Sequence, residues 1–73
     1  MATLFDLINK HKDWNTKTII SIHAYGDFNN SKVLYHGTLG NMPAKFGYLM
    51  IRSFDISYEF VYIELEKDEE NKL

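Results

Sequence analysis

The stretch FVYIELE, residues 60–66, alternates between two kinds of side chain at every step. Successive side chains of a β-strand point to opposite faces of the sheet, so alternate residues share a face. One set is aliphatic and consists of Val61, Ile63 and Leu65. The other set is aromatic and acidic and consists of Phe60, Tyr62, Glu64 and Glu66. We therefore predict a strand over residues 58–66 that buries its aliphatic side.

The start of the chain predicts a helix. The run Thr3-Leu4-Phe5-Asp6 matches a capping box, in which a hydroxyl and a carboxylate three residues apart satisfy free N–H groups at a helix start. Apolar residues at helical spacing follow, so the helix is expected from residue 4 to about residue 13. Trp14 is then expected to fold back onto the core. Farther along, Pro43 can open a single helical turn through Phe46, because proline fits the first helical position.

Three more segments predict strands. Residues 18–25 are rich in β-branched side chains and predict the first strand. Residues 32–36 predict the second strand, and the Gly, Asp and Asn residues of 26–31 suit a hairpin loop between these two. Residues 48–54 predict a third strand, which leads into the strand over 58–66.

These elements predict a single α+β domain over residues 1–66. One N-terminal helix of about ten residues packs on a mostly antiparallel sheet of about four strands, and this helix can bury one sheet face. The expected companions of the aliphatic set in that core are Ile20, Ile22, Ala24, Leu49 and Ile51. Residues 67–73 (KDEENKL) form an acidic tail with one apolar residue, so we predict that it is disordered.

The composition excludes several classes of function. The 73 residues contain no cysteine, which excludes disulfides, thiolate nucleophiles and cysteine-based metal sites. A formal net charge of −2 disfavours a general nucleic-acid binder. No apolar run approaches the ~20 residues that span a bilayer, and the first residues do not show the charged start and apolar region that are typical of a signal segment. We expect a cytoplasmic protein that requires no cofactor and makes no membrane contact.

The sheet face opposite the helix is the candidate binding surface. Alternation places on it five residues of the types enriched at protein interfaces, which are Tyr25, Arg52, Phe54, Phe60 and Tyr62. His23, Met50 and either Leu34 or Tyr35 are expected beside them. A solvated sheet face is normally more polar, so we predict that a protein partner or a second copy covers this one. Two alternatives remain open: residues 38–47 fold across it, or the sheet curls into a partial barrel.

The residues give little support to other activities. His23 and His36 lie on strands that can pair, but their spacing does not require a metal or a proton shuttle, and we predict neither a metal site nor a catalytic residue. No serine lies in a nucleophile elbow and no glycine run matches a phosphate-binding loop, so we predict that the protein is not an enzyme. The alternative function is weak binding of single-stranded nucleic acid, with bases stacked on the same aromatic side chains.

The order of residues resembles that of short accessory proteins from phages and integrated elements of Gram-positive bacteria. Those proteins open with an L-x-D-L helix, continue into a hairpin and carry Y-x-G, then a hydrophobic–Pro pair and closing strands. The corresponding residues here are Leu4, Asp6 and Leu7, then Tyr35 and Gly37, then Met42 and Pro43, then Val61, Ile63 and Leu65. The resemblance spans residues 3–66, and the loop at 26–31 and the many aromatics depart from it. It implies a phage or mobile-element context and an accessory role, with no catalytic residues to transfer. Small acidic phage proteins often work by binding and blocking host machinery, which agrees with a binding surface on this chain.

Overall fold

The computed structural model describes residues 2–26 and 32–73, so the predicted loop lies outside the described residues except for Gly26. Within them the chain forms one α-helix, four strands and three short 3₁₀ helices. In chain order these are α1 (Leu4–Lys10), β1 (Ile19–His23), β2 (Val33–Thr38), η1 (Leu39–Asn41), η2 (Ala44–Tyr48), β3 (Ile51–Ile56), β4 (Val61–Leu65) and η3 (Glu69–Lys72).

The four strands form one sheet in the order β2-β1-β4-β3. The central strands β1 and β4 run parallel, with Ile20 opposite Val61 and Ile22 opposite Ile63. Both outer pairs, β1 with β2 and β3 with β4, are antiparallel. The prediction of an α+β fold, with one N-terminal helix on a mostly antiparallel sheet of four strands, is confirmed. β2 and β3 are the two edge strands and do not pair with each other, so the sheet is not closed into a barrel.

The helix begins at the predicted capping box. Asp6 N–H donates to the Thr3 hydroxyl, and Thr3 N–H donates to the Asp6 carboxylate. The helix ends at Lys10, earlier than predicted, because the His11 N–H turns back to the Ile8 carbonyl. The His11 ring then stacks on the Trp14 ring at 4.2 Å between centroids, and Trp14 packs against the core as predicted.

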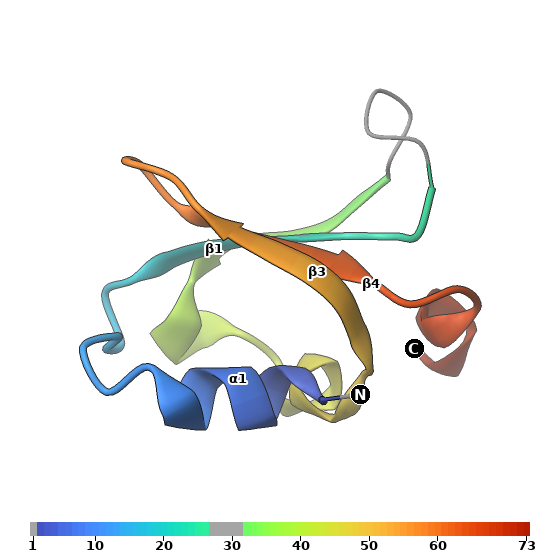
Figure 1. Cartoon of the computed structure of the whole chain (residues 1–73), viewed down its shortest axis with the longest axis horizontal. Coiled ribbons are helices and arrows are strands. Elements are labelled where there is room, and N and C mark those ends of the chain that lie inside the picture. Colours follow the sequence, from blue (N-terminus) through green and yellow to red (C-terminus); the bar gives the residue numbers. More distant parts are fainter. Residues whose placement is uncertain (1, 27–31) are drawn as a thin grey trace.

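The core lies between α1 and the sheet, and η1 and η2 join α1 on the same side (Figure 1). The predicted aliphatic companions are found there, and the largest fully buried side chains are Leu4, Ile20, Ile22, Ile63 and Leu65. Residues 38–47 therefore cover the helix side of the sheet and do not fold across its other face. At Gly47 a Cβ atom would overlap the Phe5 ring, so this glycine permits the close approach of η2 to α1.

The acidic tail differs from its predicted disorder. Residues Glu69–Lys72 form η3, and the Glu69 side chain is buried. One carboxylate oxygen accepts from the Met50 backbone N–H at 2.6 Å and the other contacts Lys72 Nζ at 2.6 Å. A charged segment can become ordered when one of its carboxylates accepts a hydrogen bond from a backbone N–H elsewhere in the fold. The composition of the segment does not reveal that such an N–H lies within reach.

Among the helices formed by residues 2–26 and 32–73, none is both long and apolar enough to cross a lipid bilayer.

Candidate functional site

The sheet face opposite α1, here called the outer face, has no described element lying across it (Figure 1). The register of β1 and β4 alternates, so the residues between the buried isoleucines point away from the helix. Pairing with β2 and β3 extends the same face to both edges. The residues that strand register and side-chain contacts place on this face include Ser21, His23, Tyr25, His36, Arg52, Ser53, Asp55, Phe60, Tyr62 and Glu64.

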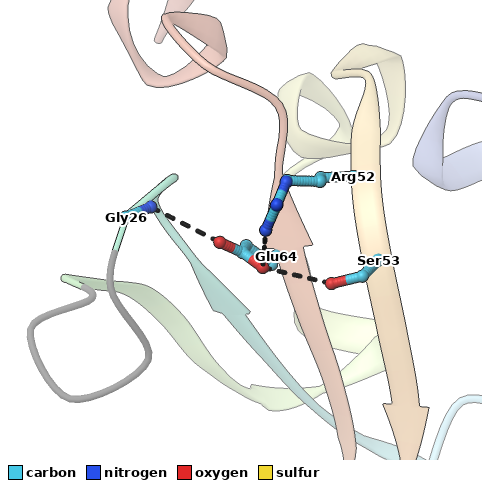
Figure 2. Close-up of polar contacts among 4 residues, drawn as sticks. All are labelled: Gly26, Arg52, Ser53 and Glu64. Atoms are coloured by element: carbon cyan, nitrogen blue, oxygen red, sulfur yellow. Dashed lines mark hydrogen bonds and ion pairs between the residues drawn. The ribbon is translucent and has the colours of Figure 1, made fainter.

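Glu64 organises one end of the outer face, as Figure 2 shows. Its Oε1 accepts from Arg52 Nη1 at 3.2 Å and from Ser53 Oγ at 3.1 Å, and its Oε2 accepts from the Gly26 backbone N–H at 3.4 Å. The residue is only 8% exposed. A buried carboxylate needs such donors, because an unpaired charge away from water is costly. Glu64 therefore ties β3 and the end of the β1 segment to β4.

Arg52 joins this carboxylate to an aromatic ring. Its guanidinium carbon lies 5.2 Å from the centre of the exposed Tyr25 ring, within the range of a cation–π contact. Glu64 also accepts from the backbone N–H of Gly26, the residue after Tyr25. Arg52 therefore contacts the Tyr25 ring, while Glu64 fixes the backbone next to it. The ring is thus presented to solvent in a defined position.

The centre of the outer face is a stack of His23 on Tyr62. Their ring centroids lie 4.1 Å apart with an interplanar angle of 28°. Ser21 Oγ and His23 Nε2 share a hydrogen bond of 2.8 Å. Burial lowers the pKa of His23 from its ordinary 6.5, and nearby His36 acts in the same direction, while Glu64 opposes them. The imidazole at this position therefore favours its neutral form near pH 7.

A second aromatic pair lies on the β2 side of this stack. The His36 and Phe60 rings meet edge to face, with centroids 5.4 Å apart and an interplanar angle of 76°. His36 lies on the edge strand β2, whereas Phe60 directly precedes β4, so the contact passes over the central strand β1. Aromatic surface consequently extends from Tyr25, which contacts Arg52 of β3, to His36 on the edge strand β2.

The structure brings together four of the five residues predicted for this surface, which are Tyr25, Arg52, Phe60 and Tyr62. The placement of the fifth, Phe54, was wrong: it pairs with Ile63 and so lies on the helix side of the sheet. There its ring meets the His11 ring edge to face, with centroids 5.6 Å apart. Leu34 and Tyr35 are both partly buried against the core, so neither adds to the outer face.

A β-bulge explains the wrong face for Phe54. The register between β3 and β4 shifts between Ile51 and Ser53, so one additional residue is inserted at Arg52. Strict alternation from Ile51 assigns Phe54 outward, and one inserted residue reverses that assignment. The same bulge leaves Arg52 free to reach the Glu64 carboxylate on the outer face.

Sequence reasoning missed the hydrogen-bonding residues that hold the aromatics. Glu64 was placed on the correct face, but its burial and its role as an acceptor for three donors were not predicted. Ser21 and Ser53 were not assigned any role on this face. The usable signal was a glutamate flanked by Ile63 and Leu65 in the middle of a core strand, because a carboxylate at such a position requires a partner.

The Ser21–His23 hydrogen bond joins a hydroxyl to an imidazole, which is the pairing that a nucleophile and its base require. A nucleophile needs both a base and room for a substrate, whereas Ser21 is only 3% exposed in a central strand. Among residues 2–26 and 32–73 there is no group of three or more His, Asp or Glu side chains arranged to hold a metal ion. The groups that this face presents are ring surfaces, one guanidinium, carboxylates and other hydrogen-bonding groups.

No family model matches the sequence, and no curated protein or solved structure shows significant similarity to it. The assignment of function rests on the geometry of this chain.

Proposed function

We propose that this chain is a small non-enzymatic accessory protein that binds another protein through the outer face of its sheet. The observation that carries the proposal is the contrast in coverage: α1, η1 and η2 all lie on one side of the sheet, and the ring pairs His23–Tyr62 and His36–Phe60 lie on the other. Tyrosine, phenylalanine and arginine are the residue types that dominate binding energy at protein interfaces.

The internal contacts of the outer face favour a rigid binding surface. Tyr62 stacks on His23, Phe60 packs on His36, and Tyr25 lies against Arg52. Side chains already held in position lose less conformational entropy when a partner docks. Such pre-ordered rings give affinity that flexible exposed side chains of the same size do not give.

Charge favours a protein partner over nucleic acid. Arg52 lies against the Tyr25 ring, and Glu64 neutralises its charge. Affinity for a nucleic-acid backbone comes mainly from cations that are available to phosphates. With Asp55 at the neighbouring position on β3, paired with Tyr62, the two carboxylates of this face outnumber its one guanidinium. A protein partner is therefore favoured. The test must distinguish it from single-stranded nucleic acid, which is the alternative ligand.

The resemblance to phage and mobile-element proteins supports an accessory role, in which the partner is a host protein whose activity is blocked. The proposal of the surface does not depend on this context. It depends on the geometry of the outer face alone.

Affinity capture from cells of the source, followed by binding measurements with the purified captured protein, tests this function. The informative variant is Tyr25→Ala combined with Phe60→Ala, which removes ring surface but leaves the Glu64 hydrogen bonds intact. The matched control is Tyr48→Ala combined with Tyr58→Ala, because both tyrosines are exposed and neither is among the outer-face residues named above. We expect at least a tenfold loss of affinity for the first pair and less than a twofold change for the control.

Two outcomes would overturn the proposal. Equal binding by both pairs of variants would place the interface elsewhere on the molecule. Tight, salt-sensitive binding to a single-stranded oligonucleotide, abolished by the outer-face pair, would make the nucleic-acid alternative the function. Circular dichroism of each variant checks that the fold is retained.

A further inference from the structure

The edge strand β3 is already paired at its beginning with the chain's own N-terminal segment. Ile51 N–H donates to the Ala2 carbonyl at 3.0 Å, and Thr3 forms an isolated antiparallel bridge with Met50. The outer edge of β3 is therefore able to accept an antiparallel strand. This pairing ends beside Ile51, and within the described residues no segment continues it along residues 52–56.

The open part of this edge is exposed and amphipathic. The five residues from Arg52 to Ile56 are all exposed, in contrast to Ile51. On the helix side the strand shows Phe54, which is 42% exposed, and Ile56, which is 55% exposed. On the outer-face side it shows Ser53 and Asp55. An unpaired edge with apolar residues at alternate positions is a template for another strand.

We propose that residues 52–56 of β3 pair antiparallel with the same residues of a second copy of this chain, across a two-fold axis at Phe54. The two sheets then form one continuous eight-stranded sheet. This contact uses the sheet edge and not the outer face, so it goes beyond the proposed binding function and stands independently of it.

Face matching and charge select the register. Directly opposite residues in an antiparallel pair share a face, so a two-fold axis passes through a single residue of β3. An axis at Asp55 would place two carboxylates opposite each other, which is destabilising. An axis at Ser53 would extend the pairing to Ile51, whose backbone N–H already donates to the Ala2 carbonyl. An axis at Phe54 avoids both conflicts.

The register centred on Phe54 is also complementary in its side chains. The two Phe54 rings lie opposite each other on the helix side, each with Ile56 of the other copy as a diagonal neighbour. On the outer-face side, Asp55 of the second copy lies opposite Ser53 and beside Arg52, and symmetry repeats this contact. The bulge at Arg52 falls at the end of the paired segment, so it does not interrupt residues 53–55.

Disulfide trapping tests this arrangement directly, because the natural chain contains no cysteine. In the Phe54→Cys variant the two thiols would lie directly opposite, at a Cα separation that permits a disulfide. Val33→Cys is the matched control, since Val33 is a similarly exposed apolar residue on the other edge strand. Under a mild oxidant we expect the Phe54→Cys variant to form a covalent dimer at least tenfold faster than the Val33→Cys variant.

Light scattering of the unmodified chain provides a measurement that depends on no substitution. We expect twice the chain mass of 8.6 kDa at high protein concentration, and a return toward the monomer mass in the Phe54→Lys variant. Tyr25→Ala combined with Phe60→Ala should remain dimeric, which separates this proposal from the outer-face function. A monomer at every concentration up to about 1 mM, or faster trapping at Val33, would overturn the pairing of β3.

Discussion

The two faces of this sheet use the same four strands in different ways. The helix side is filled by aliphatic side chains, and Leu4, Ile22, Ile63 and Leu65 are completely buried there. The outer face has no covering layer among the described elements, and its side chains pair with one another through rings, one ion pair and hydrogen bonds. Stability is therefore expected to come mainly from the helix side, whereas the outer face fixes the orientation of groups that can contact a partner.

The largest expected effect is on the helix side. Ile63→Ala should lower the free energy of unfolding by about 2–5 kcal/mol, because it removes methyl groups from a fully packed site and leaves a cavity. Tyr62→Ala, one residue away on the outer face, should cost less than half as much, since Tyr62 is only partly buried. Urea denaturation of both variants measures the difference. Equal losses would show that the two faces contribute equally to stability.

The second effect concerns the carboxylate of Glu64. Glu64→Ala should cost about 1–3 kcal/mol, because a buried acceptor is lost and its donors are left to find water. Arg52→Ala should cost less than about 1 kcal/mol, since the Arg52 side chain is half exposed and its ion pair is screened by solvent. Thermal denaturation of the two single variants checks this order, and a larger effect for Arg52→Ala would contradict it.

The third effect is a dependence of stability on pH that arises from His23. The lowered pKa of His23 means that the unfolded chain binds a proton more readily than the folded chain. The free energy of unfolding should therefore be fully retained above pH 6.5 and fall as the pH drops through the folded pKa. Denaturation curves between pH 7.5 and pH 5 measure this slope. His23→Gln should flatten this slope, and an unchanged slope in that variant would argue against this origin.

The smallest effect is expected at the C-terminal 3₁₀ helix. The pKa of Glu69 is lowered, first by its hydrogen bond with Lys72 and then by the Met50 N–H, so its contribution is present above pH 4.5 and is lost as the pH falls through the folded value. Glu69→Gln should speed hydrogen exchange at the Met50 amide severalfold and leave global stability nearly unchanged, while Glu70→Gln should change neither. Exchange at Met50 that is unaffected by Glu69→Gln would show that η3 does not depend on this contact.

Local patterns predicted the elements and most of the core. Alternation in FVYIELE assigned Val61, Ile63 and Leu65 to the helix side, and the capping box marked the start of α1, because both signals depend on residues that are close in sequence. The order of the strands was not predicted. The parallel pairing of β1 with β4 is a long-range contact that adjacent residues do not encode.

The candidate site was predicted in composition more accurately than in geometry. Tyr25, Arg52, Phe60 and Tyr62 were placed on the correct face, whereas the bulge at Arg52 reversed Phe54. A bulge leaves little trace in a single strand, because it is defined by the register with its neighbour. The hydrogen bonds of Glu64 join segments 12 and 38 residues away, which is also beyond the range of local pattern.

Radical footprinting of the free chain and of its complex with the captured protein tests the division between the two faces most directly. Tyr25 and Phe60 should be oxidised in the free chain and protected in the complex, while Tyr48 and Tyr58 should react equally in both states. Protection confined to Tyr48 and Tyr58, with Tyr25 and Phe60 still reactive, would contradict the assignment of the outer face as the binding surface.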